Sequence, residues 1–314
     1  MENFIKLHDD NADGIAEGHS IDIFDGACGS YCEQSAGGYG VGGDNIATTW
    51  SAYNSYAKLL TAMGKPALGK IYLAKANRVR DGYVRDWWNP SGNNYYAGRT
   101  IGLSGWITNF DQYSKETYAF QAVKRIAEPG PRADALLERL HKNYLENGKK
   151  YNFESFTYLP EAFYNYGKDD YAWHWLKRLL DSHYEYPEVS FTAVGAIATG
   201  MVGIEPDAPN HQVATLGHLT PQVDWVELDH VPVGAHDVLV RHERANTITT
   251  VRHNAGNVPL RWEARFPGAF SKLLVDGVPR KARRQSNNGI LVSLVTVTLE
   301  VGQQVTVAAG SPAR

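Results

Sequence analysis

The sequence predicts an α+β protein with two domains, a helical-hairpin domain over residues 1–205 and an antiparallel β-sandwich domain over residues 206–314. From Asn45 to about Gly203, apolar residues recur three and four positions apart, which is the period of amphipathic helices. After the proline-containing stretch 204–209, short β-branched runs alternate with turn signals, as in small antiparallel strands. A chain of 314 residues also has room for two domains, because one hydrophobic core rarely extends beyond about 250 residues.

The first two predicted helices form a hairpin. An apolar stripe spans residues 46–63 and is followed by Gly64, a residue type that commonly ends helices. The next helix covers about residues 66–87 and opens with Pro66, which is favoured in a first helical turn. Because a single residue separates Gly64 from Pro66, the chain must turn back at this point.

Five further helices are predicted, at about residues 114–127, 131–145, 158–166, 169–183 and 189–202. Alternate members of the series, starting with the first stripe, contain more Ala, Gly and aromatic residues and fewer charges than their neighbours. Helices of low charge are buried on more sides. The alternation therefore predicts an inner and an outer layer of about seven helices.

The C-terminal part is expected to form short strands at residues 238–241, 247–253, 260–266, 273–275, 290–297 and 304–308. Asp276-Gly277 and Asn288-Gly289 are strong signals for tight hairpin turns. The basic run Arg280–Arg284 is interpreted as a solvated loop rather than a phosphate site.

Composition and charge exclude several classes of partner. The net charge of -3 and the pI near 6.4 leave no basic excess for binding nucleic acid or an anionic membrane. The 18 Tyr and 8 Trp outnumber the 10 Phe, and rings with a polar group suit sugar-binding clefts as well as helical cores. The expected partner is a neutral small molecule or oligosaccharide.

The N-terminal residues and the cysteines add two expectations. Residues 1–6 lack the basic and apolar segments of a signal peptide, and no run approaches roughly 18 apolar residues, so a soluble chain of unknown localisation is expected. Cys28 and Cys32 are interpreted as ordinary small residues, with a local bridge as the alternative.

Asp9, Asn11, Asp13 and Gly14 match the opening of a calcium loop, D-x-[DN]-x-[DN]-G. In such loops alternate side chains supply oxygen ligands, and the glycine permits a sharp turn. Ser20 stands where the motif has a bidentate glutamate. A structural calcium ion is one expectation and a cation-free Asx turn is the other; no other cofactor is expected.

Asp22 and Asp25 are candidates for a catalytic general acid. Their Ile and Phe neighbours would exclude water from a carboxyl group and raise its pKa. The alternative is that both cap the following turn. Glu188, which follows Pro187 at the start of the most apolar helix, is the candidate for a second catalytic carboxylate.

Each predicted inner helix is preceded by polar residues: Asp44 and Asn45, Asp111 and Gln112, Glu154, and Glu188. If the inner helices are parallel, their N-terminal ends converge on one face, although capping explains each residue separately. Aromatic residues in or beside loops offer surfaces on which sugar rings stack. The expected substrate-binding residues are Tyr39, Trp106, Asp111, Glu154 and Tyr158.

The alternating helix layers, the sequence DNADGI at residues 10–15 and the sequence YPEVSFT at residues 186–192 together resemble the six-hairpin (α/α)6 toroid glycosidases. The acidic loop followed by IDIFD at residues 21–25 is similar to the non-lysosomal glucosylceramidase family, in which QTYD stands at this place. This resemblance implies that Asp25, or else Asp22, is the acid/base residue. It also implies a partial toroid, because about seven of twelve helices are present. The chain is then either the C-terminal part of a longer enzyme or an open helical layer that pairs with another copy.

The sequence therefore predicts a glycoside hydrolase, or a fragment of one, that cleaves a neutral sugar with a carboxylic acid and a carboxylate. A polysaccharide lyase of the toroid-plus-sandwich type is the first alternative, and it would require a cleft lined by Arg and Lys. A non-catalytic carbohydrate-binding or assembly module is the second, and it would stack sugars without two facing carboxyl groups.

Overall fold

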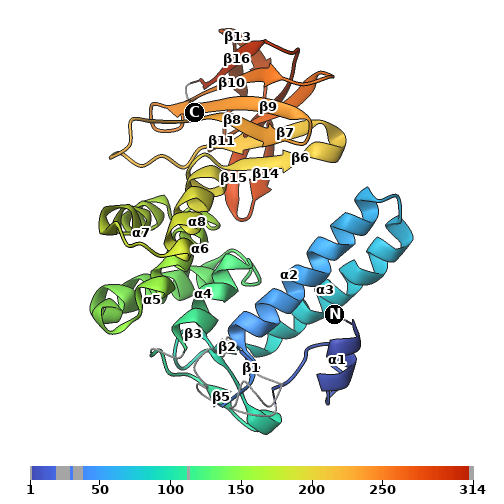
Figure 1. Cartoon of the computed structure of the whole chain (residues 1–314), viewed down its shortest axis with the longest axis vertical. Helices are drawn as coiled ribbons and strands as arrows, with labels where there is room; N and C mark the ends of the chain where they lie inside the picture. Colours follow the sequence, from blue (N-terminus) through green and yellow to red (C-terminus); the bar gives the residue numbers. More distant parts are fainter. Residues whose placement is uncertain (1, 19–28, 31–37, 112–113, 311–314) are drawn as a thin grey trace. The chain divides into compact units, whose positions relative to one another are not determined.

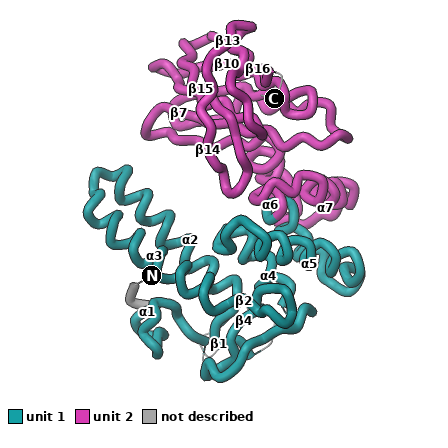
Figure 2. Tube along the Cα trace, turned by 180° about the vertical axis from the view of Figure 1, so that it is seen from behind, with its two compact units in different colours: residues 1–162 teal, residues 163–314 magenta. Residues whose placement is uncertain are grey.

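The computed structural model describes residues 2–18, 29–30, 38–111 and 114–310 and contains two compact units, residues 1–162 and 163–314 (Figures 1 and 2). The fold class is α+β, as predicted. Helices dominate the first unit, and mainly antiparallel sheets dominate the second. The predicted domain boundary at 205/206 falls within the first strand of the second unit, Ile204–Asp207, rather than at the division between the units, and it stays a prediction.

The helices of the first unit are α1 (Glu2–His8), α2 (Gly43–Ala62), α3 (Pro66–Asp86), α4 (Lys115–Val123), α5 (Pro131–Asn147) and most of α6 (Leu159–Tyr164), with 3-10 turns η2 (Ile101–Leu103), η3 (Gly148–Lys150) and η4 (Phe153–Tyr158). A three-stranded sheet has the order β1 (Tyr39–Gly42), β4 (Gly98–Thr100), β5 (Trp106–Ile107). A two-stranded hairpin joins β2 (Trp88–Asn89) to β3 (Asn94–Tyr95).

The predicted hairpin of the first two helices is confirmed, and Figure 1 shows α2 and α3 lying antiparallel. Gly64 follows α2 with a φ of +73°, the left-handed conformation that ends helices. Helix α2 also packs against α4, and a close approach fixes where it starts. A Cβ on Gly43 would lie 2.6 Å from the Thr117 carbonyl oxygen of α4. Glycine therefore lets β1 deliver the first turn of α2 directly against α4.

The second unit begins with α7 (Asp169–Ser182) and α8 (Pro187–Gly195), which continues as a π-helix, η5 (Ala196–Met201), before the 3-10 turn η6 (Ala208–Asn210). A six-stranded sheet has the order β13 (Val278–Lys281), β12 (Lys272–Val275), β16 (Gln304–Ala309), β10 (Ile248–Ala255), β9 (His236–Glu243), β8 (Trp225–Val233). A five-stranded sheet has the order β14 (Arg283–Asn287), β15 (Ile290–Leu299), β11 (Leu260–Pro267), β7 (Gln212–Leu216), β6 (Ile204–Asp207). Side chains from both sheets share one buried core, which includes Trp262 and Phe266 of β11 and Val240 of β9.

Five strands of these sheets were not predicted from the sequence, namely β6, β7, β8, β13 and β14. Strand β8 alternates polar with apolar residues, but a register shift between Leu228 and Val231 interrupts the period. The interpretation of Arg280–Arg284 as a loop is wrong, since most of this run lies in β13 and β14. The solvent exposure of this run was predicted correctly. Strand β7 pairs with β11 in parallel, an arrangement that the local sequence does not reveal.

A chain of three histidines crosses the second unit. Nδ1 of His211 lies 3.0 Å from Nε2 of His236, and Nδ1 of His236 lies 3.0 Å from Nε2 of His253. Nδ1 of His253 is 3.3 Å from the carbonyl oxygen of Leu299. His211 is exposed, whereas His236 and His253 are buried.

None of the helices in the described part of the chain combines the length and the apolar character that a bilayer-spanning helix requires.

Candidate functional site

The predicted catalytic residues are placed only in part. Asp22 and Asp25 lie outside the described residues, as do Cys28, Cys32 and Gln112. Glu188 is exposed in the first turn of α8, directly after Pro187. The pairing of Asp25 with Glu188 therefore stays a prediction.

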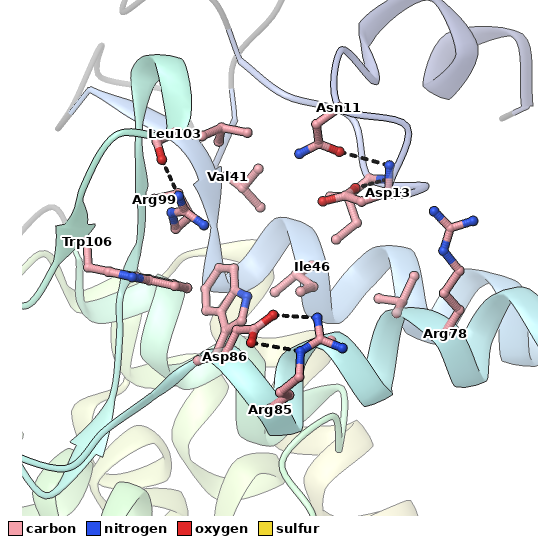
Figure 3. A pocket seen from close by; sticks show the side chains of 14 residues that line it. Asn11, Asp13, Val41, Ile46, Arg78, Arg85, Asp86, Arg99, Leu103 and Trp106 are labelled. Carbon is pink, nitrogen blue, oxygen red and sulfur yellow. Dashed lines mark hydrogen bonds and ion pairs between the residues drawn. The ribbon is translucent and has the colours of Figure 1, made fainter.

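Several predicted residues meet at one pocket of the first unit, which we call the Trp106 pocket (Figure 3). Its volume is about 290 Å³, and three of the residues predicted as functional, Asn11, Asp13 and Trp106, line it. The remaining lining comes from the acidic loop, β1, α2, α3 with the residue after it, and the β4–β5 hairpin: Ile15, Val41, Ile46, Arg78, Val79, Gly82, Arg85, Asp86, Trp87, Arg99 and Leu103. The pocket thus joins the acidic N-terminal loop to the aromatic residues that surround β5.

Trp106 forms the aromatic wall of this pocket and is held on several sides. Its ring stacks on Tyr96 with centroids 4.3 Å apart and meets Trp87 edge-on at 5.5 Å. The Arg99 guanidinium lies 4.4 Å from the Trp106 ring and donates a hydrogen bond to the Leu103 carbonyl oxygen. A half-buried indole that is fixed in this way offers an ordered surface against which a sugar ring can pack.

The opposite wall of the Trp106 pocket is polar. Asp13 comes from the acidic loop, and burial raises the pKa of its carboxyl group. The Arg85 guanidinium donates two hydrogen bonds to Asp86, at 2.9 and 2.6 Å. Arg78 donates to the carbonyl oxygen of Ala12, which ties α3 to the acidic loop. Carboxylates, an amide and apolar rings around one cavity are the groups that bind neutral sugar hydroxyls and ring faces.

A second group of functional candidates surrounds the N-terminal ends of α2 and α4, and we call Tyr39, Asp44, Asp111, Lys115 and Glu116 the helix-start cluster. Tyr39 is only 4% exposed, so it lies in the interior and not at the surface of a cleft. Burial raises the pKa of its hydroxyl group, a hydrogen bond with Thr117 lowers it, and the charges of Asp111 and Asp44 raise it further. The charges of Asp44 and Asp111, which the sequence singled out separately, thus act on the hydroxyl group of Tyr39.

Lys115 and Glu116 are the functional candidates that sequence reasoning missed. Their side chains form an ion pair at 2.6 Å and are only 6% and 10% exposed. Burial raises the pKa of Glu116, and the neighbouring Lys115 charge opposes that change. A buried carboxyl group of raised pKa is suited to hold a proton that it later transfers. The signal in the sequence is the pair of adjacent charges at the start of a helix that is otherwise uncharged.

The other predicted substrate-binding residues, Asp111, Glu154 and Tyr158, lie before α4 and on η4. Asp111 accepts hydrogen bonds from the backbone N–H of Ser114, at 3.1 Å, and from its hydroxyl group, at 3.2 Å, immediately before α4. Glu154 and Tyr158 are half-buried on η4, and the Tyr158 ring lies 4.8 Å from that of Phe120. Neither lines the Trp106 pocket. A substrate role for Asp111, Glu154 and Tyr158 stays a prediction.

Asp9, Asn11 and Asp13, the predicted metal ligands, lie in one tight loop. Carboxylate oxygens of Asp9 accept hydrogen bonds from the N–H groups of Asp13 and Gly14, both at 2.9 Å. The amide oxygen of Asn11 also accepts from the Asp13 N–H, at 2.8 Å. These bonds form the Asx turns that the sequence suggested, and they are compatible with either of the two expectations for this loop.

Several solved structures are similar to this chain. The α-L-rhamnosidase from Dictyoglumus thermophilum is similar over 85% of this chain and 32% of its own, with 11% sequence identity and a TM-score of 0.55. The GH78 family rhamnosidase of Bacillus sp. GL1 is similar over 81% of this chain and 27% of its own (12% identity, TM-score 0.48). The GH127 β-L-arabinofuranosidase from Geobacillus stearothermophilus T6 follows, over 87% of this chain and 42% of its own (10% identity, TM-score 0.37).

The first of these likenesses shows a fold shared with a glycoside hydrolase, and this chain spans about a third of that enzyme's length. No protein-family model matches the sequence, and no curated protein matches it either.

Proposed function

We propose that this chain carries glycoside hydrolase activity toward a neutral sugar, within an architecture that combines part of a helical toroid with a β-sandwich. The observation that carries this proposal is the Trp106 pocket, in which an ordered indole faces carboxylate and amide groups across a cavity of about 290 Å³. The shared fold with a rhamnosidase supports the same class of reaction. Specificity of the glucosylceramidase type rests on the sequence resemblance alone.

In the proposed mechanism, Asp25 is the acid that protonates the glycosidic oxygen as the bond to the anomeric carbon breaks. Asp22 is the alternative acid. Glu188 is the second carboxylate, which either removes a proton from the attacking water or attacks the anomeric carbon itself. Glu116 is a competing candidate for the acid, because burial raises its pKa.

The test is hydrolysis of a panel of aryl glycosides, including an α-L-rhamnoside and a β-glucoside, by the full chain. We expect Asp25→Asn and Glu188→Gln to lower kcat by about 10²- to 10⁴-fold, since each removes a proton-transfer or nucleophilic group. Asp22→Asn and Glu116→Gln measure the alternatives. Glu146→Gln is the matched control, because this residue is exposed on α5 and belongs to neither site.

The binding part of the proposal is tested in the same assay with Trp106→Ala and Trp106→Phe. We expect the alanine variant to raise KM, whereas phenylalanine keeps a ring and retains part of the affinity. Thermal melting of each variant separates loss of folding from loss of function. Wild-type activity that no carboxyl variant changes would refute the assignment of catalytic residues, and inactivity on every glycoside would favour the binding-module alternative.

One observation favours the lyase alternative and sets its test. Three arginines, Arg78, Arg85 and Arg99, line the Trp106 pocket, and lyases bind acidic sugars. Each guanidinium already has a protein partner, respectively Ala12, Asp86 and Leu103, which favours the hydrolase. Release of an unsaturated, ultraviolet-absorbing product from a uronic-acid polysaccharide would reverse this preference.

A further inference from the structure

Three carboxylates converge in the loop that leads from α1 toward the Trp106 pocket. One oxygen from each of Asp9, Asp13 and Glu17 lies within 4.8 Å of the others. Glu17 stands eight residues after Asp9, at the ninth position of a calcium loop, where such loops often bind the ion through water. Glu17 thus adds a carboxylate at the ninth position of a loop whose twelfth position is Ser20.

Glu17 supplies an independent sign that a ligand belongs here. Its side chain is only 5% exposed, and Oε2 accepts a hydrogen bond from the Asp10 N–H at 2.8 Å. Its other oxygen, Oε1, is buried and has no hydrogen-bond partner among the described residues. Burying an unpaired carboxylate oxygen is costly, so a cation at this position would stabilise it.

The three carboxylates also repel one another. Among the described residues, no Lys or Arg forms an ion pair with Asp9, Asp13 or Glu17, although Lys6, Lys75 and Arg78 line a neighbouring cavity of about 540 Å³. The positive charge of Arg78 acts on Asp13 without forming an ion pair, and this cavity, which Asp9 and Asp13 border, gives an ion access to the cluster.

We propose that Asp9, Asn11, Asp13 and Glu17 bind one calcium ion. All the donors are oxygen atoms on a curved loop, which suits calcium rather than zinc or a tightly octahedral magnesium ion. Because Asn11 and Asp13 also line the Trp106 pocket, the ion fixes the wall that faces the indole (Figure 3). The site stands independently of the proposed glycosidase activity.

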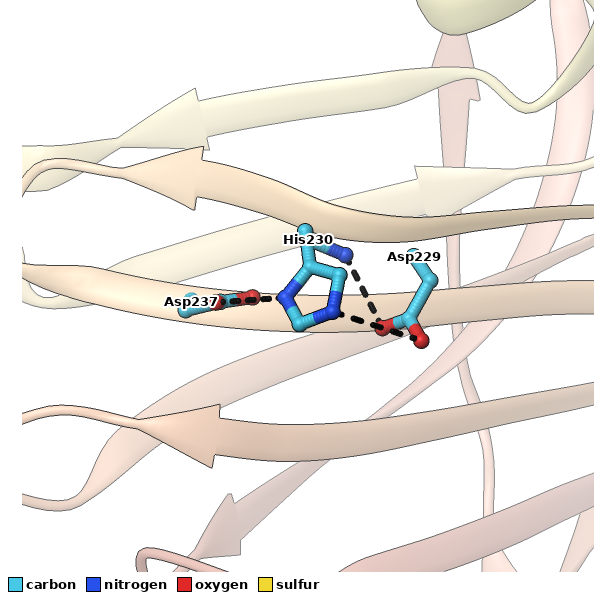
Figure 4. A group of neighbouring side chains, drawn as sticks. All are labelled: Asp229, His230 and Asp237. Carbon is cyan, nitrogen blue, oxygen red and sulfur yellow. Dashed lines mark hydrogen bonds and ion pairs between the residues drawn. The ribbon is translucent and has the colours of Figure 1, made fainter.

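A second group of metal-capable side chains carries no such proposal. Asp229, His230 and Asp237 lie together on β8 and β9 (Figure 4). His230 Nδ1 is 2.9 Å from Asp237, and the side-chain amide of Asn254 donates to both aspartates, at 2.8 and 3.1 Å. These carboxylates are exposed or half-buried and already paired, so the group is a surface ion-pair network.

The experiment uses the full chain, freed of metal with a chelator and titrated with Ca²⁺ in a calorimeter, without any glycoside. We expect one ion per chain and a higher thermal midpoint with Ca²⁺, because the ion binds the folded state. Glu17→Gln and Asp13→Asn should each weaken binding by about tenfold or more, since ligand charge sets affinity in such loops. Asp10→Asn removes the same charge from an exposed neighbour outside the cluster and should leave the affinity within about twofold.

Three results would overturn the assignment. The first is an absence of binding heat and of thermal stabilisation in the wild-type chain. The second is weakening by Asp10→Asn as large as that by the two ligand variants, which would indicate general electrostatic attraction. The third is an equal response to Mg²⁺. Circular dichroism of both ligand variants checks that they fold, and because the readout is binding, failure of the glycosidase assay leaves this test unaffected.

Discussion

His242 shows how one buried side chain couples stability to pH. Its imidazole is fully buried in the second unit. Nε2 lies 2.9 Å from the Val202 carbonyl oxygen, to which it must donate, and Nδ1 lies 2.9 Å from the Thr249 hydroxyl group. Both bonds are satisfied by the neutral ring. Burial lowers the pKa of His242 to about 4, against 6.5 for an ordinary histidine.

The first prediction is that acid destabilises the second unit through His242. Since the unfolded state binds a proton more readily below pH 6.5, stability is complete above that value and falls toward pH 4. The loss between pH 7 and pH 5 should be about 2 kcal/mol. Burial also lowers the pKa of His236, which adds a change of the same sign. Denaturant titrations across this range should show a smaller loss for His242→Gln than for the wild type, and equal losses would contradict the assignment.

At the residue scale, residue types single out candidates, but the sequence does not show which of them are buried. The acidic loop, Asp44 and Asp111 were recognised from their residue types and from their places before helices. Tyr39 was expected to stack on a sugar, yet it is buried, because a loop assignment does not reveal which ring the neighbouring sheet covers. Lys115 and Glu116 were missed because their burial depends on the contact of α4 with other elements, which no local pattern encodes.

At the scale of elements, two glycines of positive φ mark junctions with different constraints. Gly64 follows α2 at +73°, and a Cβ there would meet nothing within 4 Å. Gly203 precedes β6 at +60°, and a Cβ there would lie 1.9 Å from the Leu216 carbonyl oxygen of β7. The first position requires only a left-handed conformation, whereas the second also requires close contact between two strands.

The second prediction follows from this difference. Gly64→Ala should cost about 1 kcal/mol, the conformational penalty alone. Gly203→Ala should cost more than about 3 kcal/mol, because the backbone of β6 or β7 must also move. The melting temperatures of both variants measure these costs. Equal decreases would contradict the prediction, because they would show that the backbone at Gly203 moves to accommodate a Cβ at little cost.

Elements that depend on local sequence signals were predicted, whereas elements that depend on contacts distant in the sequence were not. The predicted helices were recovered because an amphipathic stripe and its end signals are local, and the turns Asp276-Gly277 and Asn288-Gly289 connect hairpins as expected. Helix α4 ends at Val123, earlier than predicted, with Arg125 in the left-handed conformation. Strands β13 and β14 are mostly exposed and lack the alternation from which strands are recognised, whereas an irregularity between Leu228 and Val231 interrupts the alternation of β8.

At the scale of the whole molecule, the hairpin of α2 and α3 carries exposed apolar faces. Large apolar side chains are exposed on α2 and α3: Tyr56, Leu59, Met63, Leu68, Ile71 and Leu73. Leu59 and Met63 are four residues apart, and Leu68 and Ile71 are three apart, so each pair shares one face of its helix. The resemblance offers two covers for these faces, the rest of a longer enzyme or a second copy of this chain, and the second copy would bring the same apolar faces.

The third prediction is therefore that the chain forms a homo-oligomer through α2 and α3. Light scattering after size exclusion should give a mass above that of one chain, and Leu59→Glu with Ile71→Glu should shift it to a single chain by placing charges in an apolar contact. Leu145→Glu on α5 is the control, because Leu145 is 54% exposed and both target residues are 53% exposed. A single-chain mass for the wild type at all concentrations would contradict the prediction.

The row of three histidines in the second unit has one more implication, which concerns direction. A carbonyl oxygen can only accept, so Nδ1 of His253 carries the hydrogen that points to Leu299. In a neutral row, Nε2 of His253 must then accept from His236, and Nε2 of His236 must accept from His211. One carbonyl group thus selects the same tautomer in three successive rings and aligns their dipoles. Reversing any one ring would break the hydrogen bonds on both sides of it. The two nitrogen–nitrogen distances are equal, yet every hydrogen bond in the row is donated in the same direction, toward Leu299.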